Sequence, residues 1–209
     1  MAASATLGSA ANLLVRNTGV NVSNTLVSSG ASTAFWTLSS KPGGASQAIG
    51  SNPFRYFNGA YASDTVAAAW VSPGSDGTAG VGGVYTYDLS VDLTGFDPAT
   101  ASISGTFSTD NEGSIYLNSD NPVATNSGAA FGSMHAFTLN SGFVAGLNTI
   151  HVTVNNAGDP TAFIVQFSSA TATPNVPGVP VPASVWLTIA GLTLVGFYMG
   201  YRHRSGLNF

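Results

Sequence analysis

The chain contains no cysteine and very few charged residues. Only 7% of its 209 residues are charged, against about 25% in an average soluble domain. Without cysteine there is no disulfide framework, no thiolate metal site and no cysteine nucleophile. The five Lys and Arg residues are too few to neutralise a track of phosphates, which excludes a nucleic-acid-binding protein.

Aromatic and small polar residues are plentiful by contrast. The chain has 12 Phe, 7 Tyr and 3 Trp, and 44% of its residues are hydrophobic. Disordered chains combine a high net charge with few aromatics, so this composition argues against disorder. It indicates an exported β protein whose surface consists of hydroxyl and amide side chains.

Apolar and polar residues alternate with a period of two through much of residues 10–168. Over 85–93, for example, Tyr and Leu positions alternate with Thr, Asp and Ser. This alternation is typical of strands that bury one face, and Gly, Pro and Asn turns separate the stretches. We therefore predict an all-β domain over 1–168, an antiparallel β-sandwich with jelly-roll topology. An immunoglobulin-like topology is the alternative.

The C-terminal part has a different pattern. Residues 169–183 are rich in Ser, Thr and Pro and are predicted to form a semi-rigid linker. Residues 184–201 are uncharged and apolar, and as a helix they would be about 27 Å long, close to the thickness of a bilayer core. Arg202 and Arg204 follow directly. The positive-inside rule therefore predicts a transmembrane helix with a cytoplasmic tail over 202–209.

The order of these C-terminal features resembles the PEP-CTERM sorting signal of Gram-negative bacteria. The short proline motif consists of Val179, Pro180, Val181, Pro182 and Ala183. The resemblance implies an exosortase-type processing enzyme and the inner membrane as partners. The stretches 87–98, 109–118 and 143–150 are similar to the ectodomain common in PEP-CTERM proteins. They are more loosely similar to galactose-binding-like jelly rolls.

Oxygen-bearing side chains concentrate around residues 110–121. Asp110, Glu112, Asn118 and Asp120 are of the kind that Ca²⁺ prefers, since it takes about six to eight oxygen ligands. We therefore name them as possible ligands of a structural calcium, and we expect no other cofactor. The alternative is that these side chains cap turns by accepting hydrogen bonds from nearby backbone amides.

The aromatic residues of the first third are candidates for a sugar-stacking platform. Trp36, Trp70 and Tyr61 carry this prediction, with Tyr56 and Phe57 near them in the sequence. Aromatic rings suit the apolar face of a pyranose, and neighbouring amides suit its hydroxyls. The alternative is that the same rings pack in the core.

The spacing of the acids and histidines does not favour catalysis. Asp88 and Asp92 lie about 13 Å apart along one strand face, more than the roughly 5–9.5 Å of glycosidase carboxylate pairs. We expect them to keep the sheet soluble and to discourage edge pairing. His135 and His151 are predicted surface or edge residues, with His151 facing solvent or a groove. No Gly-x-Ser-x-Gly or His-Glu-x-x-His motif is present, so we predict no enzyme.

Taken together, these features predict an exported protein that is held by the membrane at least transiently and then reaches the cell surface or the medium. Its expected role is structural or adhesive, in a surface layer or an exopolysaccharide matrix. The alternative is a carbohydrate-binding module on the cell surface. Residues 1–8 contain neither a basic region nor an apolar run, so we expect a trimmed mature start.

Overall fold

The alternating stretches of the sequence form β-strands. The computed structural model describes residues 10–127 and 130–175. Within these ranges the chain forms eleven strands and one short 3-10 helix, η1. Their bounds are β1 Ala11–Asn12, β2 Thr37–Ser40, β3 Phe54–Arg55, β4 Val71–Ser72, β5 Gly83–Asp92, β6 Phe96–Asp110, β7 Glu112–Leu117, β8 Ala124–Asn126, η1 Ala130–Gly132, β9 His135–Leu139, β10 Leu147–Asn156 and β11 Ala162–Pro174.

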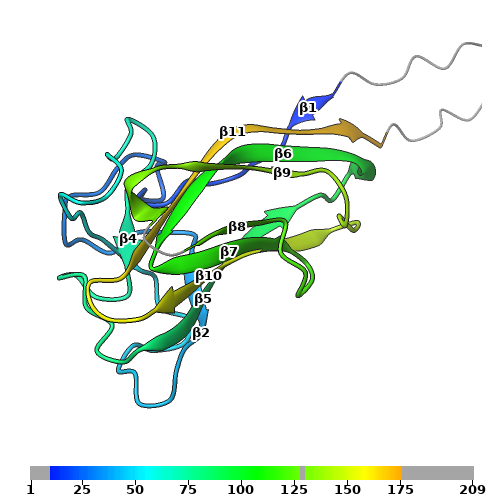
Figure 1. The fold of residues 1–209 in the computed structure, drawn as a ribbon. Coiled ribbons are helices and arrows are strands. Elements are labelled where there is room, and N and C mark those ends of the chain that lie inside the picture. The colour runs from blue at the N-terminus through cyan, green and yellow to red at the C-terminus, as the bar shows by residue number, and fades with distance from the viewer. Residues whose placement is uncertain (1–9, 128–129, 176–209) are drawn as a thin grey trace, which may run out of the picture. The chain divides into compact units, whose positions relative to one another are not determined.

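The strands form two antiparallel sheets that lie against each other as two layers (Figure 1). The six-stranded sheet has the order β3-β4-β11-β6-β9, with β1 paired to β11, and the five-stranded sheet has the order β2-β5-β10-β7-β8. Four pairs are nested within one another: β4 with β11, β5 with β10, β6 with β9 and β7 with β8. Successive pairs alternate between the two sheets. The prediction of an all-β antiparallel sandwich is confirmed.

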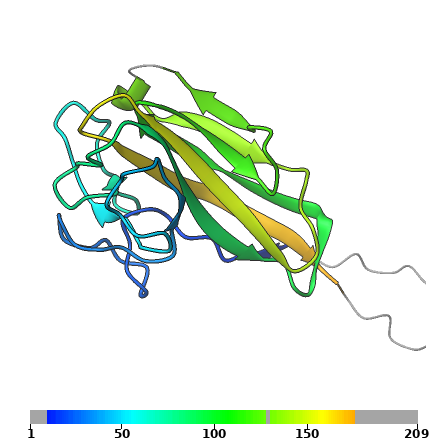
Figure 2. The ribbon, with the colours of Figure 1, turned by 90° about the horizontal axis from the view of Figure 1, so that it is seen from below.

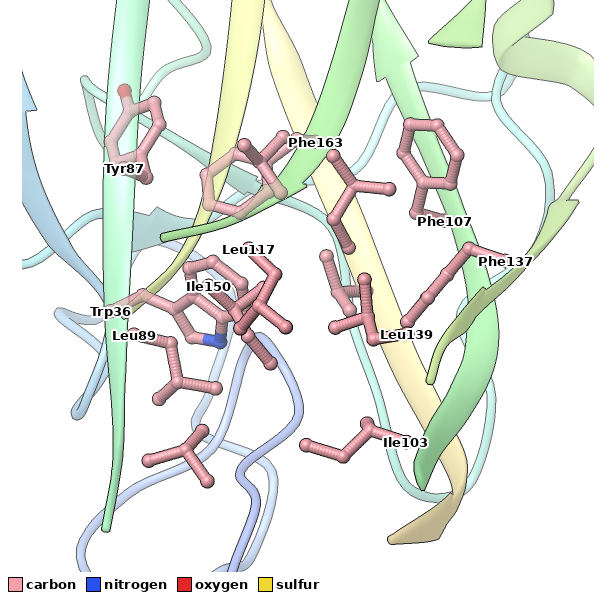
Figure 3. Packing of buried hydrophobic residues seen from close by; sticks show 14 of the residues in the cluster. Trp36, Tyr87, Leu89, Ile103, Phe107, Leu117, Phe137, Leu139, Ile150 and Phe163 are labelled. Carbon is pink, nitrogen blue, oxygen red and sulfur yellow. The ribbon is translucent and has the colours of Figure 1, made fainter. Parts of the chain in front are cut away.

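The main core fills the space between the sheets (Figure 3). Tyr87 and Ile150 reach into it from the five-stranded sheet, and Phe107 and Phe163 from the six-stranded sheet. The Tyr87 and Phe163 rings lie 4.5 Å apart, and Trp36 meets Phe163 edge-on at 5.6 Å. Because each large apolar side chain contributes about 1.5–3 kcal/mol when buried, this core stabilises the domain without disulfides.

A second apolar group covers part of the outer face of the six-stranded sheet. This outer cluster consists of Tyr61, Ala68, Trp70, Ala162 and Ile164. Along β11 its members alternate with residues of the main core, so the beginning of this strand is buried on both faces. The cover comes from the connection before β4 and from the region of η1.

The connections that precede β5 gather at one end of the sandwich (Figures 1 and 2). At the other end, β1 pairs with the last part of β11, with Ala11 opposite Ala172. The described chain therefore enters and leaves the sandwich side by side, at the end away from the long connections.

The last strand extends further than the sequence pattern predicts. We expected the domain to end at residue 168 and the linker to begin at 169, whereas β11 continues to Pro174. Ala170 and Ala172 are buried between exposed or half-buried Ser and Thr residues, and this stretch pairs with both β6 and β1. Small apolar residues and Thr carry a weak strand signal, which is why the boundary was placed six residues too early.

The predicted sorting motif at 179–183, the predicted transmembrane helix at 184–201 and Arg202 and Arg204 lie outside the described residues. Across 10–127 and 130–175, no helix is both long and apolar enough to span a membrane.

Candidate functional site

A polar groove lies on the outer face of the five-stranded sheet. Its volume is about 370 Å³, and it is open to solvent. We call it the outer groove, and its lining residues are Ser39, Thr86, Asp88, Tyr116, Asp120, His151 and Thr153. They come from β2, β5, β7, β10 and the connection after β7.

Strand alternation and register bring the central residues of the groove together. Along β5 and β10 buried positions alternate with more exposed ones, and on β7 Tyr116 lies between the buried Ile115 and Leu117, so Asp88, His151 and Tyr116 face outward. His151 lies opposite Asp88 on one side and opposite Tyr116 on the other. One row across three strands therefore holds a carboxylate, an imidazole and a phenol, three groups that are more than 25 residues apart in the sequence.

The Tyr116 and His151 rings are stacked. Their centroids lie 4.5 Å apart and their planes differ by 16°. Residues directly opposite on antiparallel strands approach closely enough for such ring pairs to form. We call this stacked pair the aromatic wall of the groove, and it lies beside hydroxyl and carboxylate groups.

Two opposing effects act on the pKa of His151. Burial lowers it, because the charged imidazolium loses solvation, and this outweighs the attraction of Asp88 and Asp120, which raises it. The net effect keeps His151 neutral at neutral pH. The groove then carries the negative charges of Asp88 and Asp120, and none of its lining residues is Lys or Arg.

The structure places the predicted sugar platform inside the protein. Trp36 and Trp70 are 0% exposed and Tyr61 is 6% exposed. Trp36 belongs to the main core, whereas Trp70 and Tyr61 belong to the outer cluster. The three rings therefore form no common exposed surface, and they pack as the alternative interpretation expected. Of the nearby rings, Phe57 is 46% exposed and Tyr56 is half-buried.

The predicted calcium ligands do not come together either. Asp110 and Glu112 lie at one end of β7 and Asn118 and Asp120 at the other, about 20 Å apart at 3.3 Å per residue. Glu112 accepts a hydrogen bond from Asn155, and Asn118 donates one to Asn148. Among the described residues, no three His, Cys, Asp or Glu side chains are grouped so as to hold a metal ion. The sequence cluster is separated because its middle is a strand.

Asp110 occupies a buried position in contact with the outer cluster. It is 5% exposed and accepts a hydrogen bond from the Tyr61 hydroxyl at 2.8 Å. Burial raises the pKa of the Asp110 carboxyl, and the Tyr61 hydroxyl partly offsets this. The same burial, with the Asp110 charge beside it, raises the pKa of Tyr61 strongly. Both effects fit a structural role.

The remaining sequence candidates lie close to where the pattern put them. His151 lines the outer groove, as predicted, and His135 is half-buried on the edge strand β9. Asp88 and Asp92 share the outer face of β5. At Asp88 the strand lies between β2 and β10, so this residue does not guard an edge, which corrects that part of the prediction. β2 pairs only with residues 86–88 of β5, so Asp92 lies beyond the paired stretch. Asp92 caps the following turn by accepting a hydrogen bond from Thr94.

Tyr116 is the aromatic residue of this site that the sequence did not reveal. Its alternation with Ile115 and Leu117 marks it as outward-facing, but nothing local says that it meets His151. That contact depends on the register between β7 and β10. Comparison with known proteins adds no further residues, since no family model, no curated protein and no solved structure matches the chain.

Proposed function

We propose that the chain is an exported cell-envelope protein whose sandwich domain is a structural or adhesive component of a surface layer or an exopolysaccharide matrix. The observation that carries this proposal is the contrast between a packed apolar core and an outer sheet face that is rich in hydroxyl and amide groups, such as Thr86, Thr149, Thr153 and Asn155. Such groups donate and accept hydrogen bonds, as the hydroxyls of a polysaccharide do.

The nested strand pairs support a finer description of the fold. Eight strands, β4 to β11, pair from the outside inward, and the pairs alternate between the two sheets. A double-sheet arrangement of eight strands with two Greek keys is a jelly roll. We assign the domain to this class.

The C-terminal sequence supports export and sorting. A proline motif at 179–183, an apolar stretch at 184–201 and then Arg202 and Arg204 follow one another in the order of a PEP-CTERM signal. We infer an exosortase-type enzyme and the inner membrane as partners. The protein is then released to the cell surface or the medium.

The test is the intact mass of the protein from its native host, measured separately in membrane and medium fractions. We expect a form in the medium that ends near Pro180–Pro182. A full-length form found only in membranes would instead make the apolar stretch a permanent anchor and would contradict the sorting role. A full-length form in the cytoplasm would contradict export altogether.

The second candidate function is a carbohydrate-binding module, and the outer groove is the observation that favours it. Aromatic rings beside hydroxyls and carboxylates are the combination that holds a sugar, since rings contact its C–H groups and oxygens accept from its hydroxyls. The full chain on a glycan array would test this. Saturable binding to particular sugars is expected, and uniform weak retention would favour the purely structural role. The absence of enzymatic activity stays a prediction.

A further inference from the structure

The two carboxylates of the outer groove differ from every other carboxylate in the protein. The chain has nine Asp and Glu residues, and all lie in the described ranges. Seven accept hydrogen bonds from other protein groups: Asp64, Asp76, Asp92, Asp97, Asp110, Glu112 and Asp159. Asp88 and Asp120 accept none from any described residue, and both line the outer groove.

No described cation neutralises them. Arg55 pairs with Asp64 at 2.9 Å, Arg16 lies over the Phe35 ring, and Lys41 donates to the Ala45 carbonyl. Within the groove, the one group able to become positive is His151, and its burial opposes that charge. The groove therefore presents uncompensated negative charge next to an aromatic wall.

We propose that the outer groove binds a saccharide that carries a free amino group, with the sugar ring against the Tyr116–His151 pair and the ammonium group at Asp88 and Asp120. This deepens the carbohydrate-binding role and rests on it. An ammonium group donates charge-assisted hydrogen bonds to carboxylates, which are stronger than bonds between neutral groups. The hydroxyls of Ser39, Thr86 and Thr153 remain for the hydroxyls of the sugar.

The same charges argue against other ligands. A uronic acid or a sulfated sugar would bring a second negative charge close to Asp88 and Asp120 with no cation between them, and like charges repel. A metal ion would need a third ligand, and no group of three exists in the described part of the chain. A simple amine without a ring would use the carboxylates but not the aromatic wall.

The experiment compares two probes that differ at the sugar nitrogen, which is a charged ammonium group in one and a neutral acetamide in the other. The full chain, kept in a detergent that contains no sugar, is titrated calorimetrically with an oligomer of glucosamine and with the N-acetylated oligomer of the same length, at about pH 5.5, where the free amine is protonated and carboxylates are ionised. We expect the free-amine oligomer to bind at least about tenfold more tightly, which corresponds to one charge-assisted contact.

Three variants locate the effect. Replacing both groove carboxylates, Asp88→Asn with Asp120→Asn, should bring the two affinities to within about twofold of each other. Tyr116→Ala should weaken both oligomers by about three- to tenfold, because it removes half of the aromatic wall. Glu112→Gln is the control, since it removes one negative charge from the same sheet face outside the groove, and it should leave the preference intact. Circular dichroism should confirm that all variants are folded.

Each contrary result has a distinct meaning. Equal binding of both oligomers by the unmodified chain, or preference for the acetylated one, would overturn this inference and leave the carbohydrate-binding role standing. No binding of either oligomer or of any neutral glycan would contradict both. A polyamine that binds as tightly as the glucosamine oligomer, or a Glu112→Gln variant that loses the preference, would also overturn the inference. The preference for the free-amine oligomer would then come from negative charge in general and not from the outer groove.

Discussion

An aromatic pair lies at the outer face of each sheet of the sandwich, and the two pairs differ in how deeply they are buried. Tyr61 and Trp70 lie 4.4 Å apart over the six-stranded sheet, and Tyr116 and His151 lie 4.5 Å apart on the five-stranded sheet. The first pair is buried, with Trp70 at 0% and Tyr61 at 6% exposure, whereas the second pair is half-buried and lines a groove. The difference is that the connection before β4 and the region of η1 cover the first pair, whereas the second pair is open to the groove.

Backbone carbonyl and amide groups form hydrogen bonds around the first pair. The Trp70 indole donates to the Ala62 carbonyl at 2.7 Å, and the Ala62 amide in turn donates to the Phe131 carbonyl at 2.8 Å. The Tyr61 hydroxyl donates to Asp110. The polar group of each ring is thus satisfied inside the protein. The Tyr116 hydroxyl and the His151 imidazole have no hydrogen-bond partner among the described residues, so they remain available to a ligand.

The largest loss of stability should come from removing one ring of the buried pair. Trp70→Ala should lower the free energy of unfolding by about 3–5 kcal/mol, because it removes a fully buried ring and leaves a cavity. Urea denaturation followed by circular dichroism measures this. A loss below about 1 kcal/mol would mean that the outer cluster contributes little and that the contrast between the two faces is not energetic.

The covered region should also have its own pH dependence. Because burial raises the folded-state pKa of Asp110, the native state binds a proton before the unfolded state does as the pH falls. The stability of the unmodified protein relative to Asp110→Asn should therefore increase as the pH falls from about 7 to about 4. Paired urea titrations give this difference, and a flat difference would contradict the raised pKa.

At His151 in the outer groove, stability should change with pH in the opposite direction. Burial lowers the folded-state pKa of His151 below 6.5, so the unfolded state takes up the proton first as the pH falls. The stability of the unmodified protein relative to His151→Gln should therefore decrease as the pH falls below about 6.5. Titration of the imidazole by NMR provides the direct measurement. A pKa above the ordinary value would mean that Asp88 and Asp120 outweigh burial.

The smallest effect is expected where nothing covers the side chain. Val66 is 99% exposed although it lies in the connection that carries the cover, so Val66→Ser should change the free energy of unfolding by less than about 0.5 kcal/mol. The same denaturation assay applies. A loss as large as 2 kcal/mol would show that the connection before β4 depends on apolar contacts at Val66.

Much of the fold could be predicted from local pattern, and much of the site could not. Alternation over 85–93 predicted both the strand β5 and the outward position of Asp88. Alternation also predicted that His151 would face a groove or solvent. The end of β11 was missed, because Ala170, Ala172 and the Thr residues between them carry little apolar signal. The predicted calcium ligands lie apart because β7 separates residues that are close in the sequence.

The sequence by itself determined the two-layer all-β architecture, the absence of disulfides and the hydroxyl-rich surface, since each follows from composition or from a period of two residues. Only the tertiary structure decided which aromatic rings are reachable. Trp70 is buried because segments far from it in the sequence close over it, whereas Tyr116 meets His151 because of the register between two strands. Coverage and register depend on contacts between distant residues, and local alternation does not record them.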